Sequence, residues 1–281
     1  MNPASRGGPG AARASCEAAA RTGAGSVLIA IPARLASTRL PSKPLLDLGG
    51  EPMIARVARN ALRVGGVRVV VVTDDPTVAA AARGVGADAH LSVVPVASGS
   101  DRIRRFLDEA GRAWPGVVVN LQGDEPLLEP HVVEALLARV GEPGVRVATP
   151  LRALRGGEAS DPDVVKAALR PDGVIEDFAR LPLEDLPPVT DEEELRCAQG
   201  RRWHAHVGVY AFRAEAFRAF TDRPPSPREQ RERLEQLRML ENGIPVHGVV
   251  VETSAVSVDT PEDAERVRRI LRAGSRAPGE A

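Results

Sequence analysis

Apolar residues in the first half of the chain alternate between short continuous runs and helically spaced sets. The runs at 27–31, 67–73 and 117–121 are almost entirely aliphatic, as is typical of strands covered on both faces. Helical spacing separates these runs, and this β-α-β alternation favours parallel strands joined by crossover helices. We predict strands at 27–31, 67–73, 87–91 and 117–121, and helices at 52–64, 76–83, 101–113 and 131–140, the third capped by Ser98 or Ser100.

The pattern changes after residue 145, where short strand-like segments follow one another closely. Pro171, Asp172 and Gly173 predict a hairpin turn between two of these segments. We predict strands at 145–151, 163–169, 174–178, 204–212 and 246–251, a loop at 181–200, and helices at 229–241 and 261–272. The sequence therefore predicts an α/β fold, with a doubly wound, mostly parallel sheet and a smaller antiparallel insertion.

The two ends of the chain lack this periodicity. Residues 1–25 are mainly Ala, Gly, Arg and Ser, and we predict flexible tails there and at 274–281. The leader has no apolar signal-peptide segment, and Glu17 interrupts it, although a transit peptide or an early start codon would look similar. We predict a single domain at 26–273, with a smaller acceptor-binding or dimerisation subregion at about 150–213.

Composition narrows the class of protein. A chain of 281 residues with 43% hydrophobic residues can fill a core, which argues against a disordered or fibrous protein. A net charge of −1 gives no positive field for nucleic acid or anionic lipid, and no apolar run is long enough to cross a bilayer. Two cysteines exclude a disulfide framework and a thiolate zinc cage, which favours the cytoplasm.

Basic residues are almost all arginine. Of the 37 basic side chains only Lys43 and Lys166 are lysines, a bias that a GC-rich genome explains most simply. Because arginine is the standard cation in this chain, a lysine marks a candidate site that needs a compact ammonium group instead of a planar guanidinium.

Positive and hydroxyl side chains gather directly after the first predicted strand. This loop carries Arg34, Ser37, Thr38, Arg39 and Lys43. In a parallel sheet it lies at the carboxyl edge, where ligands usually bind, and three cations there would suit a triphosphate. The loop is neither a Walker loop nor a dinucleotide fingerprint, so a solvated basic loop is the alternative.

Polar residues also end the strand at 117–121. Asn120, Gln122, Asp124 and Glu125 interrupt the apolar run at the same predicted edge. Asp124 is a suitable oxygen ligand for Mg²⁺, and Gln122 can hydrogen-bond a base, a ribose or an acceptor. In the alternative interpretation, the two acids cap the following helix and occupy its first turn.

A third acidic position lies near the end of the chain. Asp259 follows a short apolar stretch and precedes Thr260 and Pro261. Taken by itself, this pattern is an ordinary helix start, with Asp or Thr as the cap and Pro in the first turn.

Eight segments, taken in order between about 27 and 271, resemble the 3-deoxy-manno-octulosonate (Kdo) cytidylyltransferases, also called CMP-Kdo synthetases. The segments are IPARLASTRLPSKPL, VVVVTDD, SGSDR, VNLQGDEP, DPDVVKAAL, HVGVYAFR, LEQLRMLENG and SVDTPEDAERV. The resemblance implies a nucleotide-diphospho-sugar transferase-like fold, a homodimer and a requirement for Mg²⁺. It also implies a cytoplasmic step of lipopolysaccharide biosynthesis, in which CTP and Kdo are joined with release of pyrophosphate.

The same resemblance implies roles for individual residues. Those expected to hold the CTP phosphates are Arg34, Ser37, Arg39 and Lys43. The expected magnesium ligands are Asp124 and Asp259, and with Arg34 and Lys43 they form the expected catalytic set. The nucleotide side would include Ser98, Gly99 and Gln122, and the acceptor side Gln122, Arg180, His206, Glu235 and Gln236. In the alternative interpretation, His206 is a structural strand residue, and Glu235 and Gln236 lie on a solvated helix face.

Departures from the family pattern fall mainly on the acceptor side. Val96 replaces a histidine of the family, Ser100 replaces a threonine, and the stretch 177–183 differs from the usual Y-F-S-R and I-P pattern. A phosphonate acceptor such as phosphonoformate is therefore an alternative to Kdo. A catalytically silent nucleotide-binding relative is a second alternative, against which the retained Arg34, Lys43 and two aspartates argue.

Overall fold

The first four strands form a parallel sheet with helical crossovers. The computed structural model describes residues 26–36, 40–111, 113–180, 195–196 and 202–275. The strands are β1 (Val27–Ala33), β2 (Val67–Thr73), β3 (Asp88–Leu91) and β4 (Val117–Leu121), in the spatial order β3-β2-β1-β4. The connecting segments carry η1 (Lys43–Leu45), α2 (Met53–Leu62), α3 (Pro76–Gly84), α4 (Gly99–Glu109) and α5 (Pro130–Gly141). The predicted β-α-β progression is confirmed.

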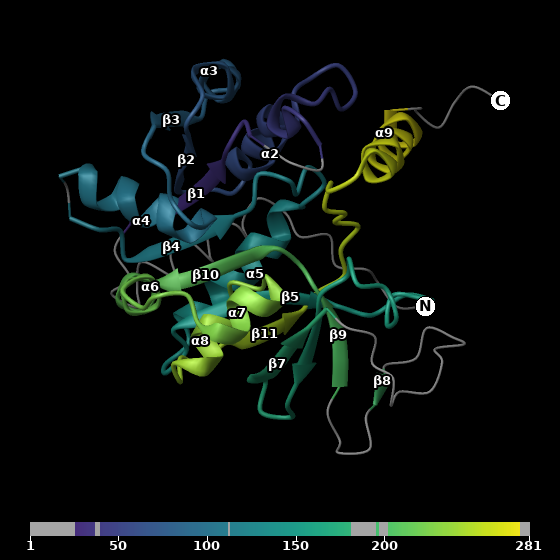
Figure 1. The fold of residues 1–281 in the computed structure, drawn as a ribbon. Coiled ribbons are helices and arrows are strands. Elements are labelled where there is room, and N and C mark those ends of the chain that lie inside the picture. The colour runs from purple at the N-terminus through teal and green to yellow at the C-terminus, as the bar shows by residue number, and fades with distance from the viewer. Residues whose placement is uncertain (1–25, 37–39, 112, 181–194, 197–201, 276–281) are drawn as a thin grey trace.

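The sheet continues from β4 into a mainly antiparallel half (Figure 1). In the described residues the order runs β3-β2-β1-β4-β10-β5-β9-β6-β7, with β11 parallel beside β5 and β8 beside β9. These strands are β5 (Val147–Arg152), β6 (Lys166–Leu169), β7 (Ile175–Ala179), β8 (Leu195–Arg196), β9 (Arg202–His206), β10 (Val209–Arg213) and β11 (His247–Val250). Strand β10 runs antiparallel to both β4 and β5, so it joins the two halves of the sheet.

Helices cover both faces of this sheet, as the doubly wound prediction requires. Along β1, Ile29 and Ile31 pack into one apolar cluster with α2, α3, α5 and α9 (Pro261–Ser275). Leu28 and Ala30 point to the opposite face, where α4, α6 (Ala214–Thr221) and α8 (Leu237–Glu241) pack. This alternation explains why the β1 sequence is apolar at every position, since each face is buried.

Two predicted elements are interrupted in the structure. The strand predicted at 204–212 is wrong as one element, because β9 ends at His206 and β10 begins at Val209. The helix predicted at 229–241 is also wrong. It divides into α7 (Pro227–Glu232) and α8, because Arg233 adopts a left-handed conformation with φ of 53°. Helix α6 was not predicted.

Most of the remaining boundaries lie within two residues of the prediction. The exceptions are β6, which begins at Lys166 instead of residue 163, α4, which ends at Glu109 instead of about residue 113, and α9, which continues to Ser275 instead of ending at residue 272. The predicted turn at Gly173 connects β6 to β7 as an antiparallel hairpin, with φ of 80° at that glycine. Strands β2 and β4 have the predicted bounds. The tail predicted at 1–25, residues 276–281 of the tail predicted at 274–281, and most of the loop predicted at 181–200 lie outside the described residues. The tail prediction is wrong at Gly274 and Ser275, which belong to α9. The domain boundaries stay predictions. In the part of the chain that the structure describes, no helix is long and apolar enough to cross a bilayer.

Candidate active site

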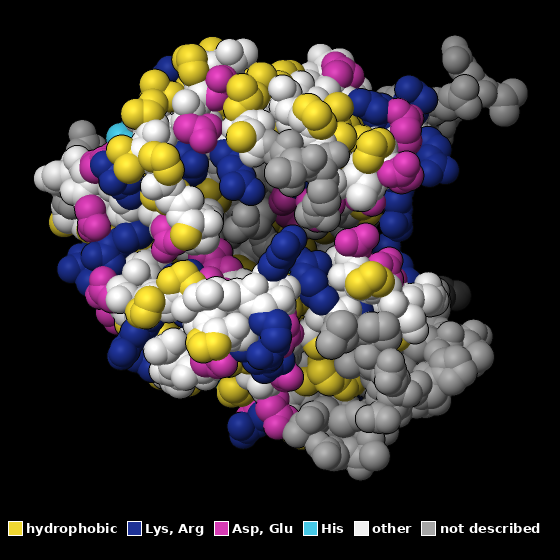
Figure 2. Space-filling view, in the orientation of Figure 1, with side chains coloured by type: hydrophobic (Ala, Val, Ile, Leu, Met, Phe, Trp, Pro, Cys, Tyr) yellow, Lys and Arg dark blue, Asp and Glu magenta, His cyan; other side chains and the backbone are white. Residues whose placement is uncertain are grey.

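Two cavities open at the carboxyl edge of the parallel strands and meet there. The smaller, of about 330 Å³, lies beside the loop after β1 and the start of α4. The larger, of about 750 Å³, extends toward the antiparallel half. Figure 2 shows the molecule hollowed between these two halves. Gln122, Asp124 and Asp259 line both cavities and therefore mark their junction.

The small cavity contains most of the residues predicted for the nucleotide. Arg34 follows the last residue of β1, is exposed, and lines this cavity with Ser98 and Gly99. Ser98 caps α4 by accepting a hydrogen bond from the Asp101 backbone N–H. A Cβ at Gly99 would lie 3.1 Å from Pro32, so glycine permits α4 to begin close to β1. The predicted Ser37 and Arg39 lie outside the described residues.

Lys43, Asp124 and Asp259 meet at the junction of the cavities. The Lys43 ammonium donates to Asp124 Oδ2 at 2.7 Å and to Asp259 Oδ1 at 2.8 Å. Burial by itself would lower the pKa of Lys43, but the charges of both aspartates outweigh it and raise this pKa above 10.5. The ammonium is therefore charged at neutral pH and lies between the two carboxyl groups.

The local structure explains why Asp259 is available for this contact. Thr260 caps α9: its hydroxyl accepts from the Asp263 N–H, while the Asp263 carboxylate accepts from the backbone N–H groups of Asp259 and Thr260. The Asp259 carboxylate is not the cap of the helix and points to Lys43 instead. Asp124 has no capping role either, because α5 begins at Pro130 with Glu129 at its N-cap position.

Glu125 connects the three segments around the junction. Its Oε1 accepts from the Gly208 N–H at 3.3 Å and from the Ser257 hydroxyl. The Val258 N–H also donates to the Asp124 carbonyl, which fixes the segment carrying Asp259 beside that carrying Asp124. Burial, with a smaller contribution from the Asp124 charge, raises the pKa of Glu125 to about 7.

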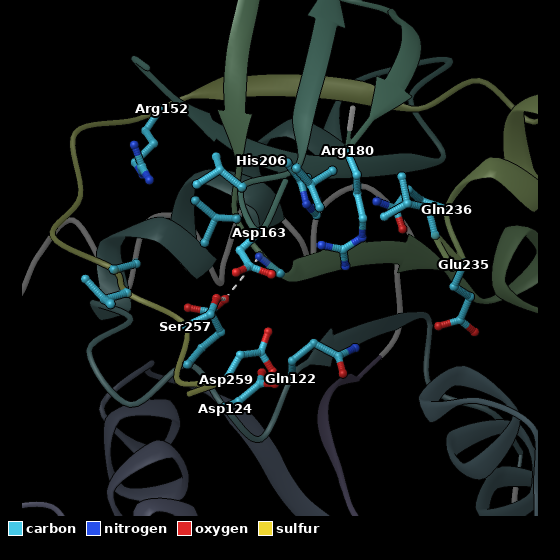
Figure 3. Close-up of a pocket in the computed structure, with 18 of the residues that line it drawn as sticks. Gln122, Asp124, Arg152, Asp163, Arg180, His206, Glu235, Gln236, Ser257 and Asp259 are labelled. Carbon is cyan, nitrogen blue, oxygen red and sulfur yellow. Dashed lines mark hydrogen bonds between the residues drawn. The ribbon is translucent and has the colours of Figure 1, made fainter. Parts of the chain in front are cut away.

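The residues predicted for the acceptor line the large cavity (Figure 3). Arg180 follows β7, His206 ends β9, and Glu235 and Gln236 precede α8. In Figure 3, Arg180 and His206 face Asp124 and Asp259 across the cavity. The structure therefore brings these side chains to the same cavity.

His206 is uncharged and has a defined tautomer. Burial, reinforced by the positive charge of Arg180, lowers the pKa of His206 to about 3. The Thr149 hydroxyl donates to the Val209 carbonyl at 2.8 Å, so it can only accept from His206 Nε2, which lies 2.9 Å away. The proton is thus on Nε2, and Nδ1 carries a lone pair.

A polar network connects the two sides of the site. The Ser98 hydroxyl donates to Glu235 Oε1 at 2.6 Å. Separately, the Gln122 amide donates to Asn120 Oδ1 at 3.1 Å, and the Asn120 amide donates to the Ser100 hydroxyl at 2.9 Å. Because Glu235 is largely buried, its pKa is raised, although hydrogen bonds from Ser98 and Ser100 reduce this effect.

Several residues at the site were missed from the sequence. Arg152 lines the large cavity and pairs with Glu158 through two hydrogen bonds of 2.7 and 2.9 Å. Ser257 also went unnoticed; it fixes the junction by donating to Glu125, which the sequence had already placed at the ligand edge. Arg102 lines the small cavity while donating to Asp74 and to the Ser92 carbonyl. Arg102 belongs to the quoted SGSDR segment, so its position in that motif was an available signal. Arg152 carries no comparable signal.

Comparison with known proteins identifies the family. The family model described as "Cytidylyltransferase" matches residues 28–253. The 3-deoxy-manno-octulosonate cytidylyltransferase of Anaeromyxobacter dehalogenans is 42% identical, over 89% of this chain and 99% of that protein. The Bradyrhizobium enzyme of the same name is 43% identical over 87% and 97%, respectively. The chain belongs to the 3-deoxy-manno-octulosonate cytidylyltransferase family. The resemblance stated from sequence motifs is thereby confirmed.

Solved structures agree with this assignment. A CMP:2-keto-3-deoxy-manno-octonic acid synthetase complexed with CTP is similar, with a TM-score of 0.76 and 37% identity over 89% of this chain and 99% of that protein. A putative glucose-1-phosphate thymidylyltransferase from Bacillus anthracis, 16% identical over 91% of this chain and 98% of that protein, has a TM-score of 0.62 and shows the shared fold alone. The predicted nucleotide-diphospho-sugar transferase fold is confirmed.

Proposed function

We propose that this cytidylyltransferase transfers CMP from CTP to Kdo and releases pyrophosphate. The observation that carries the proposal is the junction of two cavities at Gln122, Asp124 and Asp259, with the Lys43 ammonium between the two carboxylates. A nucleotide in the small cavity would present its phosphates to this junction. An acid in the large cavity would approach the same point from the opposite side.

Asp124 and Asp259 suit a magnesium ion. No cluster of three or more His, Cys, Asp or Glu side chains able to hold a metal occurs within the described residues. Two carboxylates are nevertheless a common protein contribution to a Mg²⁺ site, in which substrate phosphates and water supply the remaining oxygens. The donor set therefore fits Mg²⁺ bound together with CTP. When bound, the metal would neutralise phosphate charge and lower the pKa of a coordinated hydroxyl.

The chain's own residues would position the two reactants and neutralise charge. Arg34 and Lys43, with the predicted Ser37 and Arg39, would bind the phosphates of CTP. An acceptor hydroxyl attacks the α-phosphorus in line, a new O–P bond forms, and the bond to the β-phosphate oxygen breaks as pyrophosphate leaves. The hydroxyl proton passes to a carboxylate, for which Asp259 is our candidate.

The large cavity suits a hydroxylated acid. Arg180 supplies a positive charge for a carboxylate, and the unprotonated Nδ1 of His206 can accept a hydrogen bond from a hydroxyl group. Glu235 and Gln236 would complete the polar lining of this cavity. Fully ionised phosphonoformate has no hydroxyl hydrogen to donate to His206, so this residue favours Kdo over phosphonoformate.

A pyrophosphate-release assay tests the proposal. Purified protein with CTP and Mg²⁺ is supplied separately with Kdo, an amino-sugar variant of Kdo and phosphonoformate. We expect rapid turnover with Kdo. If only phosphonoformate were turned over, the acceptor would be phosphonoformate and the assignment of Kdo would be wrong. If the protein bound CTP but turned over none of the acceptors, it would be a catalytically silent relative.

The assembly and cellular place of the enzyme belong to the same proposal. We propose a homodimer, a cytoplasmic location and a role in lipopolysaccharide biosynthesis, with CTP and the sugar acid as small-molecule partners and no nucleic acid or membrane partner. The near-neutral net charge supports the last of these points. Analytical ultracentrifugation at micromolar concentration would test the dimer, and a single species of 29.8 kDa would contradict it.

A further inference from the structure

We propose that Lys43 serves as an internal cation at the metal site. In the nucleotide-free enzyme its ammonium occupies the space between Asp124 and Asp259, and nucleotide phosphates must draw it away before a divalent metal can bind both carboxylates. This inference rests on the proposed function, which assigns the metal to those two aspartates. It adds an order of binding, in which the metal enters with or after the nucleotide.

The geometry makes the ammonium and the metal mutually exclusive. Lys43 Nζ lies 2.7 Å from Asp124 Oδ2 and 2.8 Å from Asp259 Oδ1, the usual length of a charge-assisted hydrogen bond. A Mg²⁺ ion on the same two oxygens would lie about 2.1 Å from each. The two cations would then repel each other at close range, so both cannot bind these two oxygens in this arrangement.

Lys43 also has an alternative anionic partner within reach. Its side chain lines the small cavity with Arg34, where the phosphates of CTP are proposed to bind. The aspartate side chains are about 30% exposed and that of Lys43 is 15% exposed, so the contact borders this cavity. A lysine stem with four rotatable carbons can turn toward phosphate without a movement of the backbone.

The residue type agrees with this role. Lys43 is one of only two lysines in a chain with 37 basic residues. An ammonium is a compact charge that can sit between two carboxylates and then move, whereas a guanidinium prefers a fixed, two-pronged contact with one of them. Because the coupling of two ligands is reciprocal, the metal should also tighten nucleotide binding once Lys43 has moved.

The first test measures metal binding without nucleotide. Mn²⁺ titrations of the nucleotide-free protein, followed by electron paramagnetic resonance, compare the wild type with Lys43→Met, a neutral side chain of similar size. We expect Lys43→Met to bind Mn²⁺ at least tenfold more tightly. Arg34→Met removes a cation from the same cavity and should change this affinity less than twofold. Equal or weaker Mn²⁺ binding by folded Lys43→Met would overturn the inference.

A second test uses the wild-type protein and so does not depend on the folding of a variant. Selective labelling with [¹⁵N]lysine gives two side-chain ammonium signals, one each from Lys43 and Lys166. We expect CTP or inorganic pyrophosphate to shift one of the two signals, and millimolar Mg²⁺ alone to leave both in place. A shift caused by Mg²⁺ alone would show that the metal displaces Lys43 without nucleotide, which contradicts the proposed order.

The two aspartate variants separate this inference from the proposed function. Asp124→Asn and Asp259→Asn should both weaken Mn²⁺ binding to the CTP complex at least tenfold. If both variants retain it, the metal assignment in the proposed function fails. If both lose it while Lys43→Met gains no affinity for Mn²⁺, the metal assignment stands and only the role of Lys43 is wrong.

Discussion

Replacing Glu125 by glutamine should change how the stability of the protein depends on pH. This carboxyl is 2% exposed, and its pKa is raised from 4.5 to about 7, first by burial and then by the Asp124 charge. The folded protein therefore holds the proton more tightly than the unfolded chain. The contribution of this bound proton to the free energy of unfolding is therefore fully present below about pH 4.5 and is lost as the pH rises toward about 7.

The magnitude follows from the size of the shift. At 1.36 kcal/mol per pH unit, a shift of this size destabilises the folded state at pH 8 by about 3 kcal/mol. In Glu125→Gln the amide oxygen can still accept from Gly208 and Ser257, while the ionisation is removed. The free energy of unfolding of the variant should therefore lose about 2.5 kcal/mol less than that of the wild type between pH 5 and pH 8, because part of the effect is already present at pH 5.

Urea denaturation measured at several pH values with EDTA checks this expectation. Glu129→Gln is a matched control on the same loop. Burial alone would raise the pKa of Glu129, but hydrogen bonds from Ser254 and Thr253 lower it. The control should therefore retain the wild-type pH dependence between pH 5 and pH 8. If Glu125→Gln retained it as well, our account of the Glu125 environment would be refuted.

Three further changes test other parts of the structure. Asp259→Asn should lower kcat by about 10²–10³-fold. The free energy of unfolding should change by less than about 1 kcal/mol, because the ion pair with Lys43 is partly exposed, and a near-normal kcat in steady-state assays would show that Asp259 has no catalytic role. Lys166→Met removes two hydrogen bonds to backbone carbonyls, one of them that of Arg180, and should lower the free energy of unfolding measured in urea by about 2 kcal/mol. Because Arg180 lines the acceptor cavity, the same change should raise KM for the acceptor more than KM for CTP. Gly248→Ala should destabilise the protein by about 1–3 kcal/mol, because the new Cβ would lie 2.7 Å from two leucine side chains. Gly84→Ala, in open space within α3, should stabilise the protein slightly, and equal melting temperatures of the two variants would contradict this packing.

The parallel half of the fold could be predicted from the sequence because its strands are buried on both faces. Continuous aliphatic runs located β2 and β4 to the residue. The elements of the antiparallel half were harder to predict. A pattern of side chains does not reveal that the chain changes partners at Gly208, or that Arg233 leaves the helical conformation between α7 and α8. These breaks depend on contacts with distant segments.

The candidate site shows the same division. Polar residues after β1 and β4 indicated a ligand edge from position alone, because parallel strands end there together. Asp259 was different, since its local pattern predicted a helix cap and only the family resemblance implied a metal ligand. Its contact with Lys43 joins residues 216 positions apart, which no local spacing encodes. The rarity of lysine was a useful signal, because the ammonium groups of Lys43 and Lys166 each donate hydrogen bonds to two oxygen atoms.

The central place of β10 has a consequence for synthesis on the ribosome. The strands β1 to β4 are complete once residue 121 has emerged, yet the next strand in space begins only at Val209. Until then β4 exposes an unpaired edge, and β5 has no neighbour to connect it to the earlier strands. Translation of almost ninety residues separates the two events, so the nascent enzyme passes through a half-built stage that is prone to aggregation and suited to chaperone binding.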